Sequence, residues 1–342
     1  MSHYRLALLG FGNVGRAFAR LLMRKEAELE AEYDIRFIVT GIATGRHGIA
    51  IDSQGLSLPK ALELVEAGKD LVPLTRMIVN TPLDFVHTVP ADVLFENSPV
   101  NHETGEPAVT HLRFALEKGM HAITANKGPV VHAFADLNAL AKKMNRKFYF
   151  ESTVMDGAPI FSLFRDALPG ARLESFRGIL NSTTNLILGR MESGETFESA
   201  VRYCQQIGLA ETDPAGDVEG WDAAIKVAAL VTVLMGVPLK PQRVARTGIT
   251  GITREMVAEA RENGRRWKLV CYAEKAGSEV NARVAPELVD STSPLFSVEG
   301  SSSIIEFHTD TLSNLSIVEG NPGPETTAYG LLADFIHTVR GH

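Results

Sequence analysis

Near its N-terminus the chain reads Leu6-Ala-Leu-Leu-Gly10-Phe-Gly12-Asn-Val-Gly15, and this stretch decides the expected fold. The apolar residues 4–9 are typical of a buried parallel strand. Residues 14–25 carry apolar side chains at helical spacing, which predicts a helix directly after the turn. The stretch therefore reads as a strand, a glycine-rich turn and a helix.

The glycines of this turn match the dinucleotide fingerprint in its expected context. Gly10 permits the tight turn, Gly12 lets the backbone approach a pyrophosphate, and Gly15 allows the helix to pack closely on the strand. The alternative is a glycine turn in a sheet protein that binds no nucleotide. The expected cofactor-binding residues of the turn are Gly10, Phe11, Gly12, Asn13, Val14 and Gly15.

Strands alternate with helices as far as about residue 150. We expect strands at 35–43, 91–96 and 121–124, helices at 58–67, 107–118 and 134–145, and a polar loop at 44–55. This alternation predicts an α/β first domain, residues 1–150, with a Rossmann-type doubly wound parallel sheet.

The pattern changes after residue 150. Expected strands at 176–180, 271–274, 279–284 and 303–308 mix with expected helices at 184–191, 197–207 and 220–235. This mixture predicts an α+β second domain, residues 151–324. The C-terminal segment 325–342 has apolar residues at helical spacing, and we expect this helix to return to the first domain.

Composition and charge favour small-molecule partners. The 342 residues are 45% apolar and 22% charged, with a net charge of -7, so nothing attracts nucleic acid or an anionic membrane.

The N-terminal apolar run is too short for a signal peptide, and no later run reaches membrane-spanning length. Two cysteines, Cys204 and Cys271, are too few for a disulfide framework and fit a reducing compartment. The cytoplasm is the expected location.

The cysteines and histidines indicate which chemistry to exclude. Cys204 lies in a helical pattern and Cys271 in an apolar strand, so we interpret both as buried structural thiols and not as nucleophiles. The ten histidines show no metal-ligand spacing, and no catalytic zinc is expected.

The loop after the second expected strand bears on cofactor choice. It reads Ala43-Thr44-Gly45-Arg46-His47 and contains no acid before Asp52, whereas an acid there holds the ribose hydroxyls of NAD. We therefore favour NADP(H), with Arg46 as the phosphate ligand and Thr44 beside it, and keep NAD(H) as the alternative. Arg46 could instead be a solvated surface residue.

Two lysines are candidates for the chemistry. Lys127 follows the strand at 121–124, at the carboxyl edge of the sheet where ligands of such folds bind, although an exposed lysine is the alternative. Asp222 and Lys226 stand four residues apart at the start of a buried helix. Such a lysine can give a proton to an alkoxide, unless the two form an ordinary surface ion pair. Glu211 is an acid suited to a substrate ammonium, or a turn residue.

Several motifs together resemble the homoserine dehydrogenases across nearly the whole chain. Besides the glycine turn they are Thr104-Gly-Glu-Pro107, Thr124-Ala-Asn-Lys127-Gly, Glu151-Ser-Thr-Val154, Gly178-Ile-Leu-Asn181-Ser-Thr183-Thr-Asn185, Glu211-Thr-Asp-Pro, Asp217-Val-Glu-Gly-Trp-Asp222-Ala-Ala-Ile-Lys226 and Pro322-Gly-Pro-Glu325-Thr-Thr-Ala-Tyr-Gly330. The segment from Glu211 to Lys226 is the specific one, because many dehydrogenases share the glycine turn.

The resemblance implies NAD(P)-dependent interconversion of L-homoserine and L-aspartate 4-semialdehyde, in threonine, methionine and isoleucine biosynthesis. It implies that Lys226 and Lys127 flank the reacting oxygen, that Lys226 is the proton donor, and that Asp222 orients it. The resemblance further implies a substrate pocket of Glu211, Asp217, Asn181 and Thr183, with Ser98 and Glu325 near the nicotinamide.

The resemblance also implies a monovalent cation, Na+ or K+, held largely by backbone oxygens near the domain junction. The matching positions are Glu151, Val154, Asp156 and Ala158, where the chain departs from the family's glycine- and alanine-rich sequence. A homodimer joined through strands of the second domain is implied as well. Because the chain ends soon after the closing helix, we expect no amino-acid-sensing domain.

Two other functions fit part of this pattern. One is an oxidoreductase on the same scaffold that acts on another amino acid or semialdehyde, since a fold does not fix a substrate. The other is a non-catalytic NADP-binding regulator, which would have no need of Lys127 and Lys226. A steady-state assay with homoserine against related amino alcohols separates the first possibility, and an assay of homoserine oxidation with NADP and NAD in parallel tests substrate and cofactor together.

Overall fold

The computed structural model describes residues 2–340, which form two compact units. The first comprises residues up to 160 together with 323 onward, and the second comprises 161–322. The boundaries expected from the sequence are 150 and 324. Residues just after 150 group with the first unit because they bind its C-terminal helix: the Glu151 amide donates to Asp334 (2.7 Å), and the Ser152 hydroxyl donates to the Thr327 carbonyl (2.8 Å).

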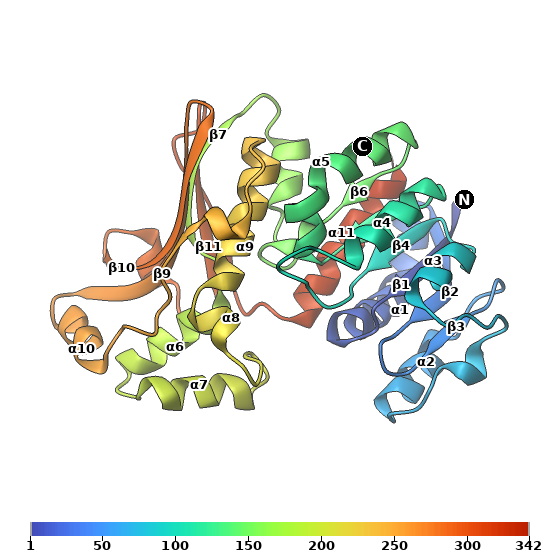
Figure 1. Ribbon diagram of the computed structural model, residues 1–342, viewed down its shortest axis with the longest axis horizontal. Helices are drawn as coiled ribbons and strands as arrows, with labels where there is room; N and C mark the ends of the chain where they lie inside the picture. Colours follow the sequence, from blue (N-terminus) through green and yellow to red (C-terminus); the bar gives the residue numbers. More distant parts are fainter. Residues whose placement is uncertain (1, 341–342) are drawn as a thin grey trace. The chain divides into compact units, whose positions relative to one another are not determined.

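A six-stranded sheet forms the centre of the first unit (Figure 1). Its spatial order is β3-β2-β1-β4-β5-β6, and every pair is parallel except β2 with β3. This is the expected Rossmann-type doubly wound sheet, with one short antiparallel strand at its edge. The strands are β1 (Ser2–Leu9), β2 (Ile35–Ala43), β3 (Ile49–Ile51), β4 (Val93–Glu96), β5 (His121–Thr124) and β6 (Phe148–Tyr149).

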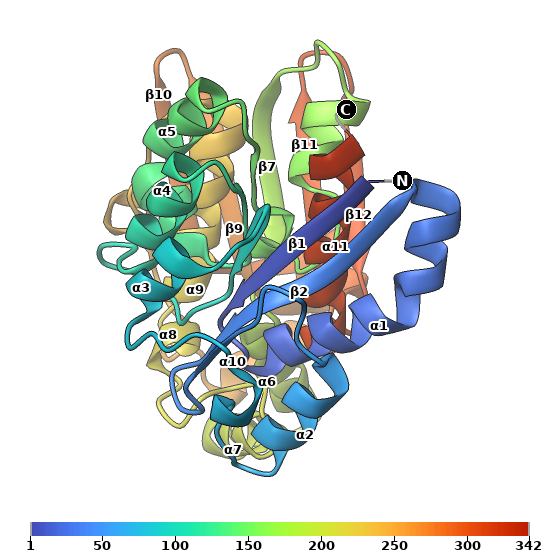
Figure 2. The same cartoon turned by 90° about the vertical axis from the view of Figure 1, so that its right-hand side faces the viewer.

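Helices cover both faces of this sheet because β1 is apolar on both sides. Leu6 and Leu8 pack in a core with residues of α1, α2 and α11, while Ala7 and Leu9 pack on the other face with residues of α3 and α4. Figure 2 shows α1 beside α11. The helices are α1 (Asn13–Tyr33), α2 (Leu58–Glu66), α3 (Pro82–Thr88), α4 (Ala108–Glu117), α5 (Lys127–Lys143) and α11 (Pro324–Arg340).

The structure adds to or corrects three local expectations for this unit. The first helix continues to Tyr33, eight residues beyond the expected end at 25. The polar loop at 44–55 contains β3, which pairs with β2 as a short hairpin. The helix expected at 134–145 matches the part of α5 that follows a kink at Ala133, whose backbone is not helical (φ -140°, ψ 15°). A helical segment from Lys127 precedes the kink and was not expected; Asn126 caps it by accepting a hydrogen bond from the Gly128 amide (2.9 Å).

The second unit is built on a mixed sheet in the order β12-β11-β7-β9-β10-β8. Neighbouring strands are antiparallel except β10 and β8. The expected strands at 271–274 and 279–284 belong to a hairpin of two twelve-residue strands. The strands are β7 (Leu173–Ile179), β8 (Ala245–Arg246), β9 (Arg265–Ala276), β10 (Glu279–Asp290), β11 (Ser303–Thr309) and β12 (Leu315–Glu319).

Five α-helices of the second unit are α6 (Ser182–Glu192), α7 (Phe197–Gln206), α8 (Ala215–Val218), α9 (Trp221–Leu230) and α10 (Arg254–Glu262). Of these, α6, α9 and α10 pack against β9. The buried apolar helix α9 continues as a π-helical turn, Val231–Met235, and ends at Gly236, which adopts a left-handed backbone with φ 69°. Among the residues described, no helix is long and apolar enough to cross a membrane.

Candidate active site

The carboxyl edge of the first sheet carries the glycine turn. Gly10 has φ 98°, and a side chain on it would collide with the Asn97 carbonyl, so only glycine fits. A side chain on Gly15 would meet the Gly10 carbonyl. Gly12 differs, because nothing lies within 4 Å of the position that its side chain would take. Gly12 is the N-cap residue of α1, and the N-terminus of a helix attracts an anion through its free amide groups.

The loop between β2 and β3 is held by its own threonine. The Thr44 hydroxyl donates to the Gly48 carbonyl (3.1 Å) and accepts from the His47 amide (2.6 Å). Arg46 is exposed at the tip of this turn. The first acid that follows, Asp52, pairs with Arg76 at 3.6 Å. The loop therefore presents a guanidinium where an NAD site would present a carboxylate.

A buried glutamate ties the ends of β4 and β5 together. Glu96 is fully buried and accepts hydrogen bonds from the Ser98 amide (3.0 Å), the Ser98 hydroxyl and the Thr124 hydroxyl (3.0 Å). Burial raises the pKa of this carboxyl, against the effect of these hydrogen bonds. The side-chain amide nitrogen of Asn126 also donates a hydrogen bond to the Ser98 carbonyl (3.2 Å). Ser98 is thus fixed in place by its neighbours.

Lys127 is the first residue of α5 and is half-buried. It follows β5, and Ser98 follows β4, so both lie at the same edge of the parallel sheet as the glycine turn. Glu325, in the first turn of α11, is exposed. Of the expected cofactor residues, the glycine turn, Ser98 and Lys127 therefore share one sheet edge.

The proposed cation ligands lie in the turn that follows β6. Glu151 and Val154 are buried, and Asp156 adopts a left-handed backbone with φ 47°. The Asp156 carboxylate accepts a hydrogen bond from the Thr326 hydroxyl (3.0 Å), while the Ala158 amide donates to the Met155 carbonyl. Carbonyl and carboxylate oxygens are the donors that a hard monovalent ion prefers, so the residue types fit such an ion. No group of three or more His, Cys, Asp or Glu that could hold a metal occurs within residues 2–340.

The second unit gathers a cluster of charged and amide side chains around α9. Lys226 pairs with Asp222 at 3.0 Å, one helical turn away, and its ammonium group donates to the Leu180 carbonyl (2.6 Å). The side chains of Lys226 and Asp222 are only 16% and 21% exposed, which distinguishes them from a surface ion pair. Asp222 also lies in the first turn of α9, where a negative charge is stabilised by the helix dipole.

Asn181 joins this cluster from α6. It caps that helix by accepting from the Thr184 amide (2.8 Å), and its amide nitrogen donates to Asp217 (2.7 Å) and to Asp222 (3.0 Å). Burial raises the pKa of Asp217, and the neighbouring charge of Asp222 raises it further. Buried Thr183 hydrogen-bonds to Asp217.

The turn between α8 and α9 explains why Asp217 and Asp222 meet. Gly220 adopts φ 82°, a left-handed conformation that reverses the chain between the two helices. Glu211 differs from these residues. It lies in an exposed loop, and its backbone carbonyl accepts a hydrogen bond from the Gln205 side chain (3.3 Å).

The two cysteines are buried thiols, as expected. Both are fully buried, and burial raises the pKa of Cys204 to about 11 and that of Cys271 to about 12. Sequence reasoning missed Glu96 and the Leu180 carbonyl. An acid as the last residue of an apolar strand was a readable signal for Glu96, whereas a backbone carbonyl leaves no signal in a sequence.

Known proteins resemble the chain along its full length. A family model described as homoserine dehydrogenase matches residues 159–336, and one described as the homoserine dehydrogenase NAD binding domain matches 10–151. A homoserine dehydrogenase of Methanocaldococcus jannaschii is 37% identical over 341 residues, with 97% of each chain covered. An NAD(+)-dependent homoserine dehydrogenase of Pseudomonas canavaninivorans is 34% identical and covers 98% of this chain and 96% of its own.

Solved structures agree with these sequence relatives. A homoserine dehydrogenase of Thiobacillus denitrificans superimposes with a TM-score of 0.84 at 30% identity, over 99% of this chain and 74% of its own. A hyperthermophilic archaeal homoserine dehydrogenase in complex with NADPH gives a TM-score of 0.84 at 26% identity, over 100% of this chain and 99% of its own. With the glycine turn and the cluster around α9, these matches show that the chain belongs to the homoserine dehydrogenases, oxidoreductases that use a nicotinamide cofactor.

Proposed function

We propose that Asp222 and Lys226 form the proton-transfer pair of this homoserine dehydrogenase. In the reductive direction, a reduced nicotinamide held at the glycine turn would supply the hydride for the aldehyde carbon of L-aspartate 4-semialdehyde. The carbonyl oxygen takes the electron pair of the former π-bond, and Lys226 gives it a proton to form L-homoserine. Oxidation of homoserine reverses both transfers, with the lysine amine taking the hydroxyl proton.

One observation carries this proposal: Lys226 is held between the Asp222 carboxylate and the Leu180 carbonyl, in a largely buried site. Two acceptors fix the position of the ammonium group, and the buried setting strengthens its interaction with a developing alkoxide. Lys127, at the sheet edge of the first unit, is the second lysine that we propose for stabilising this oxygen.

The substrate residues form the next part of the proposal. We assign Asn181, Thr183 and Asp217 to the substrate pocket, and Glu211 to the substrate ammonium. The exposed carboxylate of Glu211 is open to a ligand, whereas Asp217 is engaged by Asn181. Glu211→Gln is therefore expected to raise the KM for the semialdehyde several-fold with little change in kcat, and an unaltered KM would count against ammonium binding.

The lysine roles are tested with Lys226→Ala and Lys127→Ala assayed in parallel. We expect Lys226→Ala to lose about 10²- to 10⁴-fold in kcat, the contribution of a general acid, while NADPH affinity measured by fluorescence stays within twofold. Turnover retained in Lys226→Ala but lost in Lys127→Ala would move the proton-donor role to Lys127.

For the cofactor, we propose a preference for NADP(H), with Arg46 and Thr44 at the 2′-phosphate. The support is the exposed guanidinium of Arg46 and the engagement of Asp52 by Arg76. Ser98 and Glu325 are assigned to the nicotinamide side. NAD(H) stays the alternative, since the Pseudomonas relative is described as NAD(+)-dependent.

We also propose that Glu151, Val154, Asp156 and Ala158 hold Na+ or K+. Their oxygens would bind it, and the ion would steady the turn that is tied to α11 through Asp156 and Thr326. Activity in KCl or NaCl compared with choline chloride at equal ionic strength tests the site.

The homodimer, formed through strands of the second unit, and the cytoplasmic location remain predictions from the sequence.

A further inference from the structure

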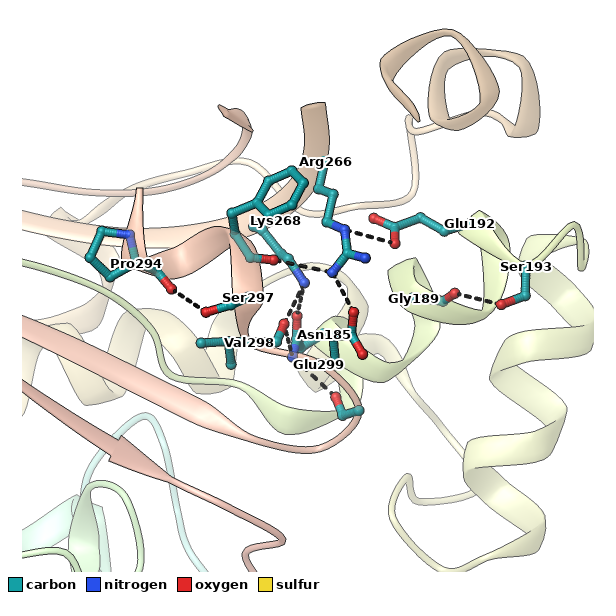
Figure 3. A network of polar contacts seen from close by, with 12 residues as sticks. Asn185, Gly189, Glu192, Ser193, Arg266, Lys268, Pro294, Ser297, Val298 and Glu299 are labelled. Carbon is teal, nitrogen blue, oxygen red and sulfur yellow. Dashed lines mark hydrogen bonds and ion pairs between the residues drawn. The ribbon is translucent and has the colours of Figure 1, made fainter. Parts of the chain in front are cut away.

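A buried lysine in the second unit takes no part in the proton transfer proposed above. Lys268 lies in β9 and is only 1% exposed. Its ammonium group donates to the side-chain carbonyl of Asn185 (2.9 Å) and to the backbone carbonyl of Val298 (2.6 Å), as Figure 3 shows. A buried ammonium is costly, so the structure must hold it in place through these acceptors.

Asn185 hydrogen-bonds to the segment that leads into β11. Its amide nitrogen lies within hydrogen-bond distance of the carbonyls of Val298 (3.3 Å), Gly300 (3.1 Å) and Ser302 (3.3 Å). Lys268 and Asn185 together therefore join three elements: β9, α6 and the 298–302 loop. We call this arrangement the Lys268 clamp.

The clamp lies one helical turn from the proposed catalytic cluster. The Asn185 amide donates to the Asn181 carbonyl (3.3 Å), and the Asn181 side chain holds Asp217 and Asp222. The 298–302 loop continues into β11, whose Ile304 pairs with Ile179 at the end of β7. The next residue, Leu180, supplies the carbonyl that binds Lys226. The clamp thus fixes both the helix cap and the strand end that hold the proton-transfer pair.

We propose that Lys268 is a positioning residue for the reaction: its ammonium group fixes α6 and the 298–302 loop so that Asn181 and Leu180 hold Asp222 and Lys226 in reactive geometry. This inference rests on the proposed role of Asp222 and Lys226. The carbonyl oxygens of Asn185 and Val298 face a cation, so loss of the positive charge weakens the clamp without removing any side chain.

Charged groups around the clamp set its protonation. Glu192 on α6, Arg266 on β9 and Glu299 in the adjoining loop face Lys268. Burial lowers the pKa of Lys268 to about 8, Glu192 and Glu299 act to raise it, and Arg266 acts to lower it. A cavity of about 380 Å³, lined by Lys268, Glu192 and Glu299 among others, lies beside the clamp. The clamp is therefore charged below about pH 8 and loses its charge above it.

The first test replaces the ammonium with an apolar side chain of similar length, Lys268→Met. We expect kcat for homoserine oxidation at pH 7.5 to fall about 10- to 100-fold, as for a supporting residue that holds reacting groups. NADP(H) affinity should stay within twofold, and the circular dichroism spectrum should match the wild type. Arg265→Gln, which removes an exposed positive charge from the same strand, is the control and should keep wild-type kcat. A folded Lys268→Met enzyme with wild-type kcat would overturn the proposal.

The second test needs no change in the clamp itself. Glu192→Gln removes a negative charge that favours the charged form of Lys268, so the alkaline decline of kcat should move to lower pH by about half a unit or more. Glu195→Gln removes an equal charge from the same cavity, at a group that pairs with Arg190, and its profile should match the wild type. Ionisation of homoserine affects the pH profile of kcat equally in the wild type and in both variants, so it cannot produce a difference between them.

A profile of Glu192→Gln that coincides with the wild type contradicts the clamp, even if Lys268→Met fails to fold. If instead the assignment of Lys226 as the proton donor is wrong, Lys226→Ala retains turnover at every pH. That result does not depend on the pH profile of Glu192→Gln. The two failures are therefore distinguishable.

Discussion

The two units prepare for chemistry in opposite ways. The carboxyl edge of the first unit offers mainly backbone: Gly10 and Gly15 bring main chains together, and Gly12 leaves open space at the start of α1. The cluster of the second unit consists of side chains, in which Asn181, Asp217, Asp222 and Lys226 satisfy one another. A cofactor phosphate needs amide groups and room, whereas proton transfer needs a titratable group held still.

This difference determines which amino-acid substitutions each unit tolerates. An added methyl group harms the glycine turn through sterics, while the cluster is sensitive to removal of a charge or of a hydrogen-bond partner.

The largest effect is expected from Gly10→Ala. A side chain there meets the Asn97 carbonyl, and the backbone is left-handed, so the variant should lose several kcal/mol of unfolding free energy and all measurable NADPH binding. Gly12→Ala is the matched control, because space is open at Gly12. It should keep its melting temperature within about two degrees yet bind NADPH about tenfold or more weakly. Wild-type NADPH affinity in Gly12→Ala would refute the pyrophosphate assignment.

A smaller effect is expected from Arg46→Ala, which tests a side chain within the backbone-dominated unit. The ratio of kcat/KM for NADP to that for NAD should fall about tenfold, since a single exposed charge contact to a phosphate is worth about 1 kcal/mol or slightly more. Lys60→Ala, which removes an exposed positive charge that pairs with Glu63 on α2, is the control and should leave the ratio near wild type. An unchanged ratio in Arg46→Ala would remove it from the cofactor site.

The smallest effect concerns stability in acid. His121 begins β5, and its Nδ1 accepts a hydrogen bond from the Lys147 amide (3.1 Å). Burial, with the charges of Arg146 and Lys147, lowers the pKa of His121 to about 4. Between about pH 4 and 6.5 the unfolded chain therefore binds this proton and the folded chain does not, so stability falls as the pH falls through that range.

His121→Gln should flatten this decline. We expect a loss of up to about 1 kcal/mol from pH 7 to pH 4 in the wild type that is absent in the variant, after allowance for solvent screening of a partly exposed ring. Denaturant unfolding at both pH values measures it. An identical acid decline in wild type and His121→Gln would show that this imidazole is not responsible.

The contrast between the units also explains what the sequence could predict. The first sheet follows from local patterns, because a strand, a glycine turn and a helix are each readable within a dozen residues. The first turn of α5 was missed because Gly128-Pro129 reads as a loop, although proline is tolerated in a first helical turn. The strand β3 was missed because a three-residue strand leaves almost no periodic signal.

In the second unit the spacing of Asp222 and Lys226 was readable, but their partners were not. Asn181 meets Asp217 and Asp222 across 36 and 41 residues, and Lys268 meets Asn185 across 83. Such contacts depend on how β7 and β9 pair, which no local pattern specifies. Lys268 was overlooked because a lysine in a strand usually points to solvent.

The most direct test of the proton-transfer assignment is chemical rescue of Lys226→Ala by small primary amines. Homoserine oxidation is measured with saturating NADP at fixed pH, with methylamine, ethylamine and less basic amines of similar size. If Lys226 is the proton-transfer residue, the amines should restore kcat saturably, and the restored rate should rise with the basicity of the amine, because the free amine takes the hydroxyl proton. Rescue of Lys127→Ala but not of Lys226→Ala would contradict it.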